Sequence, residues 1–566
     1  MAIINFKNIS TFGFDEDVLT TNSSGDRIIN FGSLTTTGDL ADGIYAGASN
    51  VSISNFGPIE TFGLGARGVY VLGNDARVEN HGSIVAHGEP DFDTFDTADG
   101  IVAIGDRFYI ANYGFIQTDG LFSSAMFGFG NGGTLVNFGS VTSSTSGGAV
   151  IIGDGGDHAQ ALNYGQIAAS GEFAFALFAG GDGALAINRG EILLTGDSDR
   201  GVRAEGDGSQ AINEGKIISS NNFIHSISAF GNNAVAANSG EILVTGDGAD
   251  GIFLDGDPKA QATNTGKIIA SGENTHGVDV FGDGASAFNS GKISMTGDGS
   301  IGISTWISLY PDIGFDHGDI VNSGEIQTKG DGAPGVLMVG DGNHLSNSGL
   351  IVTNGGAFGA DVGVTLHAAG VLVSGDGAVI DNKQSGVIES KNSASAAVEL
   401  NVLQRAGVTD AATSSLLWND GLIKGASVAV LGGAGQETIV NHGDIVGDVV
   451  LGDGNDTFVF GKHGSVLGNL FLGGGDDLVY IEKNSGSMSI ADFAAGSGGG
   501  DVIDISAFYS NFADLKAHAH QMGTDTVIAL GHNDQLVLAD VKLSALDAGD
   551  FQFKSTLGAY LTSSPT

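Results

Sequence analysis

A short motif, Asn-x-Gly-x-Ile, recurs along most of the chain at a nearly constant spacing and constrains the fold more than any other feature. Nine of its sixteen successive spacings are 25 residues, two are 26, and the others lie between 22 and 37. Its asparagines are Asn5, Asn30, Asn55, Asn80, Asn112, Asn137, Asn163, Asn188, Asn213, Asn238, Asn264, Asn289, Asn322, Asn347, Asn382, Asn419 and Asn441. A period this short indicates a repeat architecture, in which each unit is stable only when it stacks on its neighbours.

Each repeat has the pattern of three short strands. In the repeat that starts at Asn188, the runs 191–195, 201–205 and 209–213 alternate apolar and polar residues, and Gly and Asp lie between the runs. Alternation with a period of two is typical of strands with one buried face, while Gly and Asp favour turns. The sequence therefore predicts an all-β fold, a single-stranded, right-handed parallel β-helix (β-solenoid). Its rungs have about 25 residues and three strands, and they shorten to about 21 residues near the C-terminus.

Stacking of like rungs places equivalent residues above one another. Because neighbouring strands lie about 4.8 Å apart, we expect the isoleucines of the motif to form an aliphatic column. The asparagines are expected to form an amide ladder, in which each side chain bonds its neighbours. We interpret both as fold residues without a chemical role.

The composition restricts the possible partners. The 566 residues include 22 Lys or Arg and 65 Asp or Glu, which gives a formal net charge of −43. Nucleic acid and anionic lipid are excluded as partners, because both need basic patches on a protein. The chain has no cysteine, which excludes a disulfide framework and thiolate chemistry. We also expect no membrane insertion, since no apolar run approaches the roughly 18 residues of a membrane span.

Changes in the spacing divide the chain into three predicted regions, a β-solenoid of 25-residue repeats at 1–440, shorter rungs at 441–485 and a C-terminal region at 486–566. Longer spacings mark insertions at 89–99, 303–317, 355–370 and 401–415. The first two insertions mix aromatic residues with carboxylates, which suits sugar stacking or a protein contact. Ordinary surface loops have the same composition, so both interpretations stay open.

Two segments of the shorter rungs, LGDGNDTF at 451–458 and LGGGDDLV at 472–479, resemble the calcium-binding nonapeptide repeat of RTX proteins. Leu451 and Leu472 replace the first glycine of that repeat, and the two segments lie 21 residues apart instead of nine. No tandem β-roll is therefore expected. The same part of the chain is also similar to the rungs of autotransporter passenger β-helices.

The RTX resemblance implies calcium as a cofactor, with its ligands at Gly452, Gly454, Asp456, Gly473, Gly475 and Asp477. In RTX turns the aspartate side chain and backbone carbonyls supply hard oxygen ligands. Asp456 and Asp477 lie one rung apart, so we expect their carboxylates to be about 5 Å from each other. A divalent ion would relieve their repulsion.

Residues 490–553 resemble the C-termini of RTX proteins that are exported by type I secretion, in the order IADFAAGSGGGDVIDISAF, GTDTVIAL, QLVLADV and LDAGDFQF. This resemblance implies an uncleaved C-terminal export signal, the type I secretion machinery as a partner, and an extracellular or cell-surface location. The N-terminal residues have no basic segment followed by an apolar stretch, so a Sec-type signal peptide is not expected.

An enzyme is the less favoured prediction. Parallel β-helices also occur in polysaccharide lyases, epimerases and galacturonases, whose sites need clustered cations or opposed carboxylates. The arginines are scattered over many rungs, at Arg27, Arg67, Arg77, Arg107, Arg189, Arg200, Arg203 and Arg405. We therefore expect neither a catalytic residue nor enzymatic activity.

The first rung begins at Asn5, and no segment that could cap it is apparent, so its strand edges are predicted to be open. The natural partner for such an edge is another copy of the chain, docked head-to-tail. The favoured function is an extracellular structural protein that self-assembles into a filament, surface layer or biofilm matrix in a calcium-dependent manner. The alternative is an adhesin that binds cell-surface glycans, or a polysaccharide-acting lyase, epimerase or glycosidase.

Overall fold

The computed structural model describes residues 1–94, 96–144, 146–257, 259–305, 316–359, 365–400, 413–496, 498 and 500–555. The chain divides into two compact units, Met1–Gly272 (unit 1) and Glu273–Thr566 (unit 2). The regular secondary structure of the described residues is β-strand, apart from one α-helix, α1 (Phe512–Ala517), and one 3-10 helix, η1 (Ala548–Asp550). Neither of these described helices has the length and hydrophobicity needed to cross a membrane.

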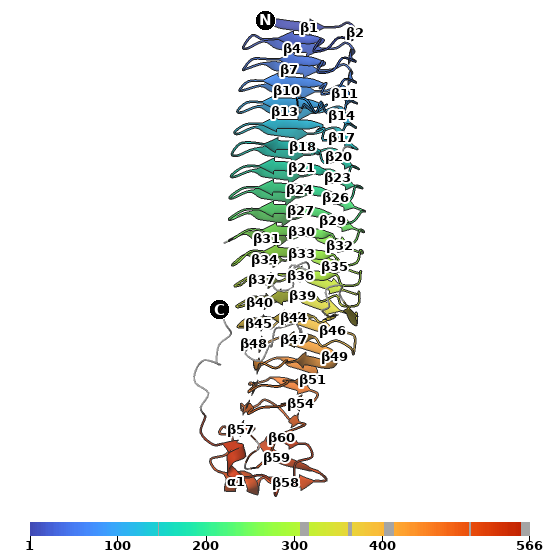
Figure 1. Cartoon of the computed structure of the whole chain (residues 1–566). Helices are drawn as coiled ribbons and strands as arrows, with labels where there is room; N and C mark the ends of the chain where they lie inside the picture. Colours follow the sequence, from blue (N-terminus) through green and yellow to red (C-terminus); the bar gives the residue numbers. More distant parts are fainter. Residues whose placement is uncertain are drawn as a thin grey trace. The chain divides into compact units, whose positions relative to one another are not determined.

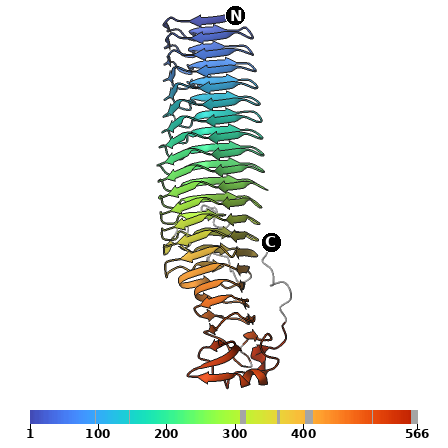
Figure 2. The same cartoon turned by 180° about the vertical axis from the view of Figure 1, so that it is seen from behind.

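Unit 1 is a parallel β-solenoid with three strands in each turn. One turn consists of β22 (Leu185–Asn188), β23 (Glu191–Leu194) and β24 (Arg200–Glu205). The next consists of β25 (Gln210–Asn213), β26 (Lys216–Ser219) and β27 (His225–Phe230). Each strand of the first turn pairs in parallel with its equivalent in the second, without a shift in register. The stacked strands are visible in Figure 1 and, from behind, in Figure 2, and they confirm the predicted three-strand β-solenoid.

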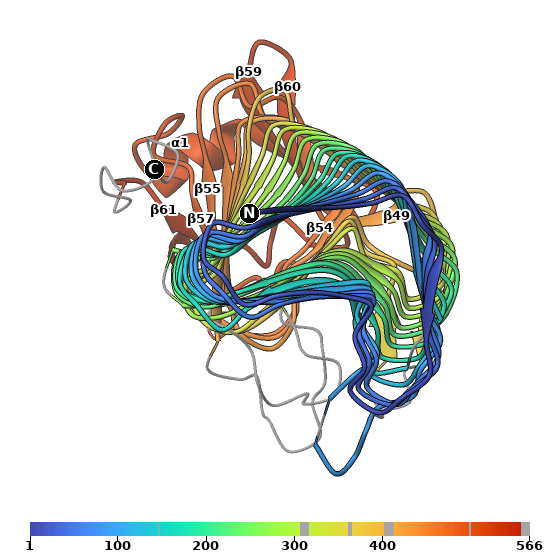
Figure 3. The same cartoon turned by 90° about the horizontal axis from the view of Figure 1, so that it is seen from above.

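The two predicted columns of repeated residues lie inside the turns. Asn188 donates its side-chain N–H to Asn213 Oδ1 at 2.8 Å, and both side chains are buried. The same bond joins successive motif asparagines over residues 5–264 in unit 1 and 289–441 in unit 2. Ile192 and its equivalents fill the core that the superimposed turns of unit 1 enclose when viewed from above (Figure 3).

The short Gly-Asp-Gly loops also link each turn of the solenoid to the next by hydrogen bonds. Asp182 Oδ1 accepts the backbone N–H of Asp207 at 3.0 Å, and Asp207 Oδ1 accepts that of Asn232 at 3.0 Å. Gly208 has a φ of 68°, in the left-handed region that glycine adopts without strain. Each carboxylate thus satisfies a backbone donor of the following turn, which confirms that these triplets are turn residues.

Unit 2 contains the same three-strand turn, for example in β37 (Asp319–Asn322), β38 (Glu325–Thr328) and β39 (Val336–Val339). Near the C-terminus the turns shorten, as predicted. The strand β52 (Thr457–Phe460) pairs with β55 (Leu478–Ile481), and equivalent residues there are 21 apart. An antiparallel hairpin of β59 (Asp525–Gly531) and β60 (Asp534–Leu538) follows. The predicted region boundaries at 440 and 485 stay predictions.

The four predicted insertions are described to different extents. The first, at 89–99, is described except at residue 95 and contains a short antiparallel bridge between Asp91 and Asp96. Residues 306–315, 360–364 and 401–412, which make up much of the other three, lie outside the described residues.

Candidate functional site

The predicted metal residues Asp456 and Asp477 lie directly before β52 and β55, and the fold stacks them in one column. Both side chains are about 1% exposed. Asp477 Oδ1 accepts the backbone N–H of Asp456 at 2.8 Å, and Asp456 Oδ1 accepts that of Glu437 at 2.7 Å. Asp501, before β57 (Val502–Asp504), extends the column, since its Oδ1 accepts the N–H of Asp477 at 3.4 Å. We call these four residues the carboxylate column.

Asp456 and Asp477 differ from the aspartates of the Gly-Asp-Gly triplets in the surroundings of one carboxylate oxygen, Oδ2. Asp456 Oδ2 and Asp477 Oδ2 are buried without a hydrogen-bond partner in the part of the chain that the structure describes. Burial raises the pKa of Asp456 to about 6 and that of Asp477 to about 7, although backbone N–H groups lower both. Buried carboxylate oxygens without a partner fit a cation, because a hard ion such as calcium binds oxygen and offsets the cost of burying the charge.

The four predicted glycines serve the close stacking of the turns. Gly452, Gly454, Gly473 and Gly475 have φ values of 105°, 151°, 92° and 142°. A Cβ atom on Gly475 would lie 1.5 Å from the carbonyl oxygen of Gly454, and one on Gly473 would lie 1.8 Å from that of Gly452. The carbonyl of Gly452 also accepts the N–H of Gly474 at 2.9 Å. The carbonyl of Gly452 is thus engaged within the protein, whereas Asp456 and Asp477 each have a buried carboxylate oxygen with no hydrogen-bond partner among the described residues.

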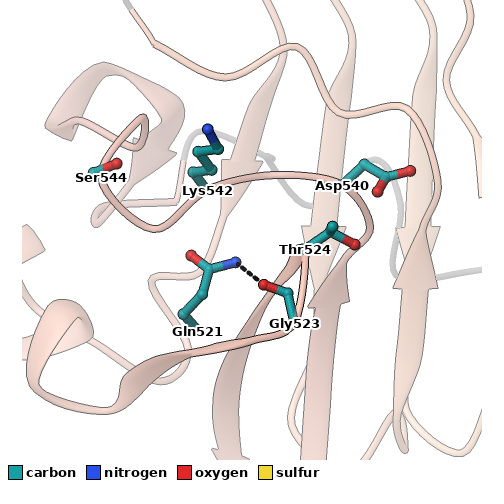
Figure 4. A pocket seen from close by; sticks show the side chains of 6 residues that line it. All are labelled: Gln521, Gly523, Thr524, Asp540, Lys542 and Ser544. Atoms are coloured by element: carbon teal, nitrogen blue, oxygen red, sulfur yellow. Dashed lines mark hydrogen bonds between the residues drawn. The ribbon is translucent and has the colours of Figure 1, made fainter.

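A surface hollow of about 320 Å³ lies near the hairpin in unit 2 (Figure 4). Its lining residues are Gln521, Gly523, Thr524, Asp540, Lys542 and Ser544. The Gln521 side chain donates to the carbonyl of Asp525 at 2.8 Å and accepts the N–H of Leu543 at 2.8 Å, so it joins the two loops that border the hollow. The hollow therefore lies between two loops that Gln521 holds together. Its charged lining residues, Asp540 and Lys542, are exposed to solvent.

A column of exposed rings runs along unit 1 and was not predicted from the sequence. It consists of the residues that follow successive motif asparagines, Phe6, Phe31, Phe56, His81, Tyr113, Phe138 and Tyr164. Neighbouring rings are stacked with centroids 4.7–5.1 Å apart. Because each inner ring is covered on both faces by its neighbours, only its edge meets solvent. The signal that could have revealed this ring column is an aromatic residue or histidine at the variable position of consecutive motifs.

A second unpredicted surface lies on the outward side of β21 (Phe175–Gly180), β24, β27 and β30 (Asp250–Asp255) in unit 1. In β21 the neighbours Leu177 and Ala179 are fully buried, so Phe178 between them points outward. The parallel register aligns Phe178 with Arg203, Ser228 and Phe253 on the following strands. We call this surface the aromatic–arginine face, and its principal residues are Phe175, Phe178, Arg203, Glu205, Phe230 and Phe253.

Arg203 lies at the centre of the aromatic–arginine face. Its guanidinium carbon is 4.0 Å from the ring centroid of Phe230 and 5.4 Å from that of Phe175, and it forms an ion pair with Glu205. Around it, Phe175 contacts Phe178 with centroids 5.6 Å apart, and Phe230 contacts Phe253 at 5.5 Å. The rings are half-buried against one another and lie around the Arg203–Glu205 ion pair, while Arg200, in register with Phe175, donates to backbone carbonyls.

The first insertion directs its carboxylates to a different arginine of unit 1. Arg67 is 8% exposed and pairs with Asp96, while its Nε lies 4.0 Å from Asp99 Oδ2. Its guanidinium carbon is also 4.2 Å from the ring centroid of Tyr70. Two acids of the insertion are thus engaged within the protein, whereas Phe92 of the same insertion is exposed.

Comparison with known proteins places the repeats in one family. The profile of the family described as the BigA third pectate lyase-like domain matches three overlapping stretches, residues 3–215, 100–310 and 200–446. Overlapping matches are expected for a chain of similar repeats, and together they span residues 3–446. No curated protein matches the chain.

Proposed function

Residues 3–446 belong to the family of the BigA third pectate lyase-like domain, and from this premise we propose that the chain is a surface-exposed, extracellular β-solenoid with an adhesive role. The observation that carries the proposal is the large amount of aromatic surface on unit 1. Both the ring column and the aromatic–arginine face expose rings on a chain with a net charge of −43. Exposed apolar patches of this kind mark binding surfaces in other proteins.

A binding role without catalysis is supported by the ion pairs that Arg67 and Arg203 form within the protein. Cleavage of polyuronates needs cations that neutralise the carboxylates of the substrate. Arg67 and Arg203 are instead paired with Asp96 and Glu205 of the protein itself. We therefore propose that the pectate lyase-like fold serves here as a scaffold.

The adhesive role can be tested on the full-length protein with insoluble cellulose, chitin and pectin and with whole bacterial cells. Depletion of the protein from the supernatant measures adhesion, and the release of reducing or unsaturated sugars measures catalysis. We expect depletion by at least one of these materials without release of sugars. Release of sugars at a steady rate would favour the enzyme alternative, and the absence of adhesion to every material would contradict the proposal.

Self-assembly is the second candidate function, and the ring column favours it. Its ring edges form a continuous aromatic line along unit 1, which suits a contact with another copy of the chain. Head-to-tail docking of strand edges, which the sequence predicts, stays an alternative geometry for the same assembly. A filament, surface layer or biofilm matrix would combine either contact with adhesion.

Export and calcium complete the proposal. We propose type I secretion on the resemblance of residues 490–553 to RTX C-termini, and calcium binding on the unpartnered oxygens of Asp456 and Asp477. These two aspartates, which lie on neighbouring turns, would hold the ion between them. Bound calcium would neutralise the buried carboxylates and stabilise the short turns around them.

A further inference from the structure

We propose that the aromatic–arginine face binds an uncharged, linear polysaccharide that lies across β21, β24, β27 and β30 of unit 1. This inference rests on the proposed adhesive function and names its binding site and its ligand class. The nearest alternatives are an acidic polysaccharide and a second copy of the chain, and both are outcomes of the test below.

The spacing of the strands suits an extended sugar chain. Successive strands of a parallel sheet advance by about 4.8 Å, which is close to the advance of one hexopyranose unit in an extended β-linked polysaccharide. Phe178 and Phe253 occupy the same register position three strands apart. A sugar chain that crosses the strands therefore meets Phe178, Arg203 and Phe253 at multiples of nearly its own repeat, while Ser228 between the last two is fully buried.

The chemistry of the face suits sugars, which have both apolar C–H faces and hydroxyl groups. The half-buried rings of Phe178, Phe230 and Phe253 offer apolar surface that can contact the C–H groups. Arg203 and Glu205 add hydrogen-bond donors and acceptors for hydroxyl groups beside these rings. The ring column lacks this combination, because its inner rings are covered on both faces by other rings.

Charge selects an uncharged sugar over an acidic one. The Arg203 guanidinium is already paired with the Glu205 carboxylate, so it cannot act as an uncompensated cation for a uronate. The chain as a whole carries a net charge of −43, which repels polyanions. The same charge opposes the close approach of a second copy at low ionic strength.

The test is calorimetric titration of the full-length protein with three hexasaccharides. Two are uncharged, of β-1,4-linked glucose and β-1,4-linked N-acetylglucosamine, and the third is of α-1,4-linked galacturonate. We expect binding of at least one uncharged hexasaccharide and at least tenfold weaker binding of the galacturonate. Phe178→Ala and Phe253→Ala should each weaken the binding about tenfold, since each removes one aromatic contact.

Phe173→Ala is the matched control, because Phe173 is 62% exposed on the turn before β21 and does not belong to the face. It should leave the affinity unchanged, and circular dichroism should show that all three variants fold. Equal affinities of the three variants, preference for the galacturonate, or no binding of any hexasaccharide would overturn the proposal. Association of copies that only the face variants abolish, without sugar binding, would assign the face to self-assembly. Adhesion of the wild-type protein in any of these cases would leave the proposed function standing.

Discussion

At the scale of single residues, the repeated asparagines carry much of the cohesion between turns. Asn213 is fully buried, its Oδ1 accepts the side-chain N–H of Asn188 at 2.8 Å, and its own N–H is donated to Asn238 at 2.8 Å. Replacement by alanine removes both bonds at once. The amide groups above and below are then left with less hydrogen bonding in a buried site.

We expect Asn213→Ala to lower the free energy of unfolding by about 2–4 kcal/mol, as the sum of two weakened buried amides. Chemical denaturation of the full chain measures the change. Gln210→Ala is the control, because Gln210 lies on the same strand and is exposed. Equal destabilisation by the two substitutions would show that the amide ladder contributes nothing specific.

We predict that Asp199 makes the free energy of unfolding of unit 1 depend on pH. Its side chain is fully buried and accepts the N–H groups of Ala174 at 2.9 Å and Gly196 at 3.2 Å. Burial nevertheless raises its pKa from 3.8 to about 7. Between these values the folded chain holds a proton that the unfolded chain releases, so the free energy of unfolding falls as the pH rises from about 4 to about 7.

Asp199→Asn should remove this part of the pH dependence, because asparagine resembles the protonated acid at every pH. Relative to the wild type, the variant should gain on the order of 2–4 kcal/mol in unfolding free energy between pH 4 and pH 7, beside a constant loss because its amide NH2 cannot accept the N–H that one carboxylate oxygen accepts. This gain should shrink towards pH 4, which thermal unfolding at several pH values can follow. The exposed neighbour Asp197 supplies the control Asp197→Asn, and an identical pH profile for wild type and Asp199→Asn would contradict the argument.

At the scale of elements, the short turns around β52 and β55 depend on buried carboxylates. Removing the charge of Asp456 and Asp477 should have the same effect as binding an ion, because both relieve the repulsion within the carboxylate column. We therefore expect millimolar calcium to raise the melting temperature of the full-length wild-type protein at pH 8. The double variant Asp456→Asn/Asp477→Asn should melt at a higher temperature than the wild type without calcium and should not respond to the ion.

The control for calcium binding is Asp476→Asn, since Asp476 is adjacent to Asp477 but exposed. This variant should respond to calcium like the wild type. If the wild type does not respond, or if the double variant responds equally, the carboxylate column does not bind calcium.

The turns themselves were largely predictable from the sequence. The strands β23, β24 and β25, which follow Asn188, are predicted by the alternation of apolar residues and by the Gly and Asp between them. Strand and turn preferences depend on residues that are close together in the sequence, and the same local pattern occurs in each repeat. The antiparallel hairpin of β59 and β60 belongs to no repeat, and its pairing was not predicted.

At the scale of the whole molecule, two features have opposite effects on association between copies. The exposed aromatic surface favours association, and the net charge of −43 opposes it. Repulsion between copies acts over a Debye length of about 10 Å at 0.1 M salt and about 3 Å at 1 M. We expect the full-length protein to be monomeric at low ionic strength and to associate as salt or calcium increases. Light scattering over a range of salt concentrations would measure this, and a monomer at every salt and calcium concentration would contradict self-assembly.

The ring column can be tested in the same experiment. Phe31→Ser/Phe56→Ser removes two exposed rings from it and should raise the salt concentration at which association begins. Phe173→Ser/Phe223→Ser removes two rings that are more exposed, at 62% each against 46% and 45%, from turns outside the column and should leave that concentration unchanged. Equal effects of the two double variants would show that general surface hydrophobicity, rather than the column, drives association.

The class of fold, the length of a turn, its three strands and the columns of asparagine and isoleucine could all be predicted from the repeats in the sequence. This was possible because these features depend on contacts between equivalent residues, and equivalence is visible as a period. Contacts between non-repeated residues became visible only in the folded chain. Arg203 and Phe230 are neighbours because of the register between β24 and β27, and among the described residues Asp456 Oδ2 is buried without a hydrogen-bond partner. Side chains that vary from turn to turn have no period, so their contacts follow only from the three-dimensional path of the strands.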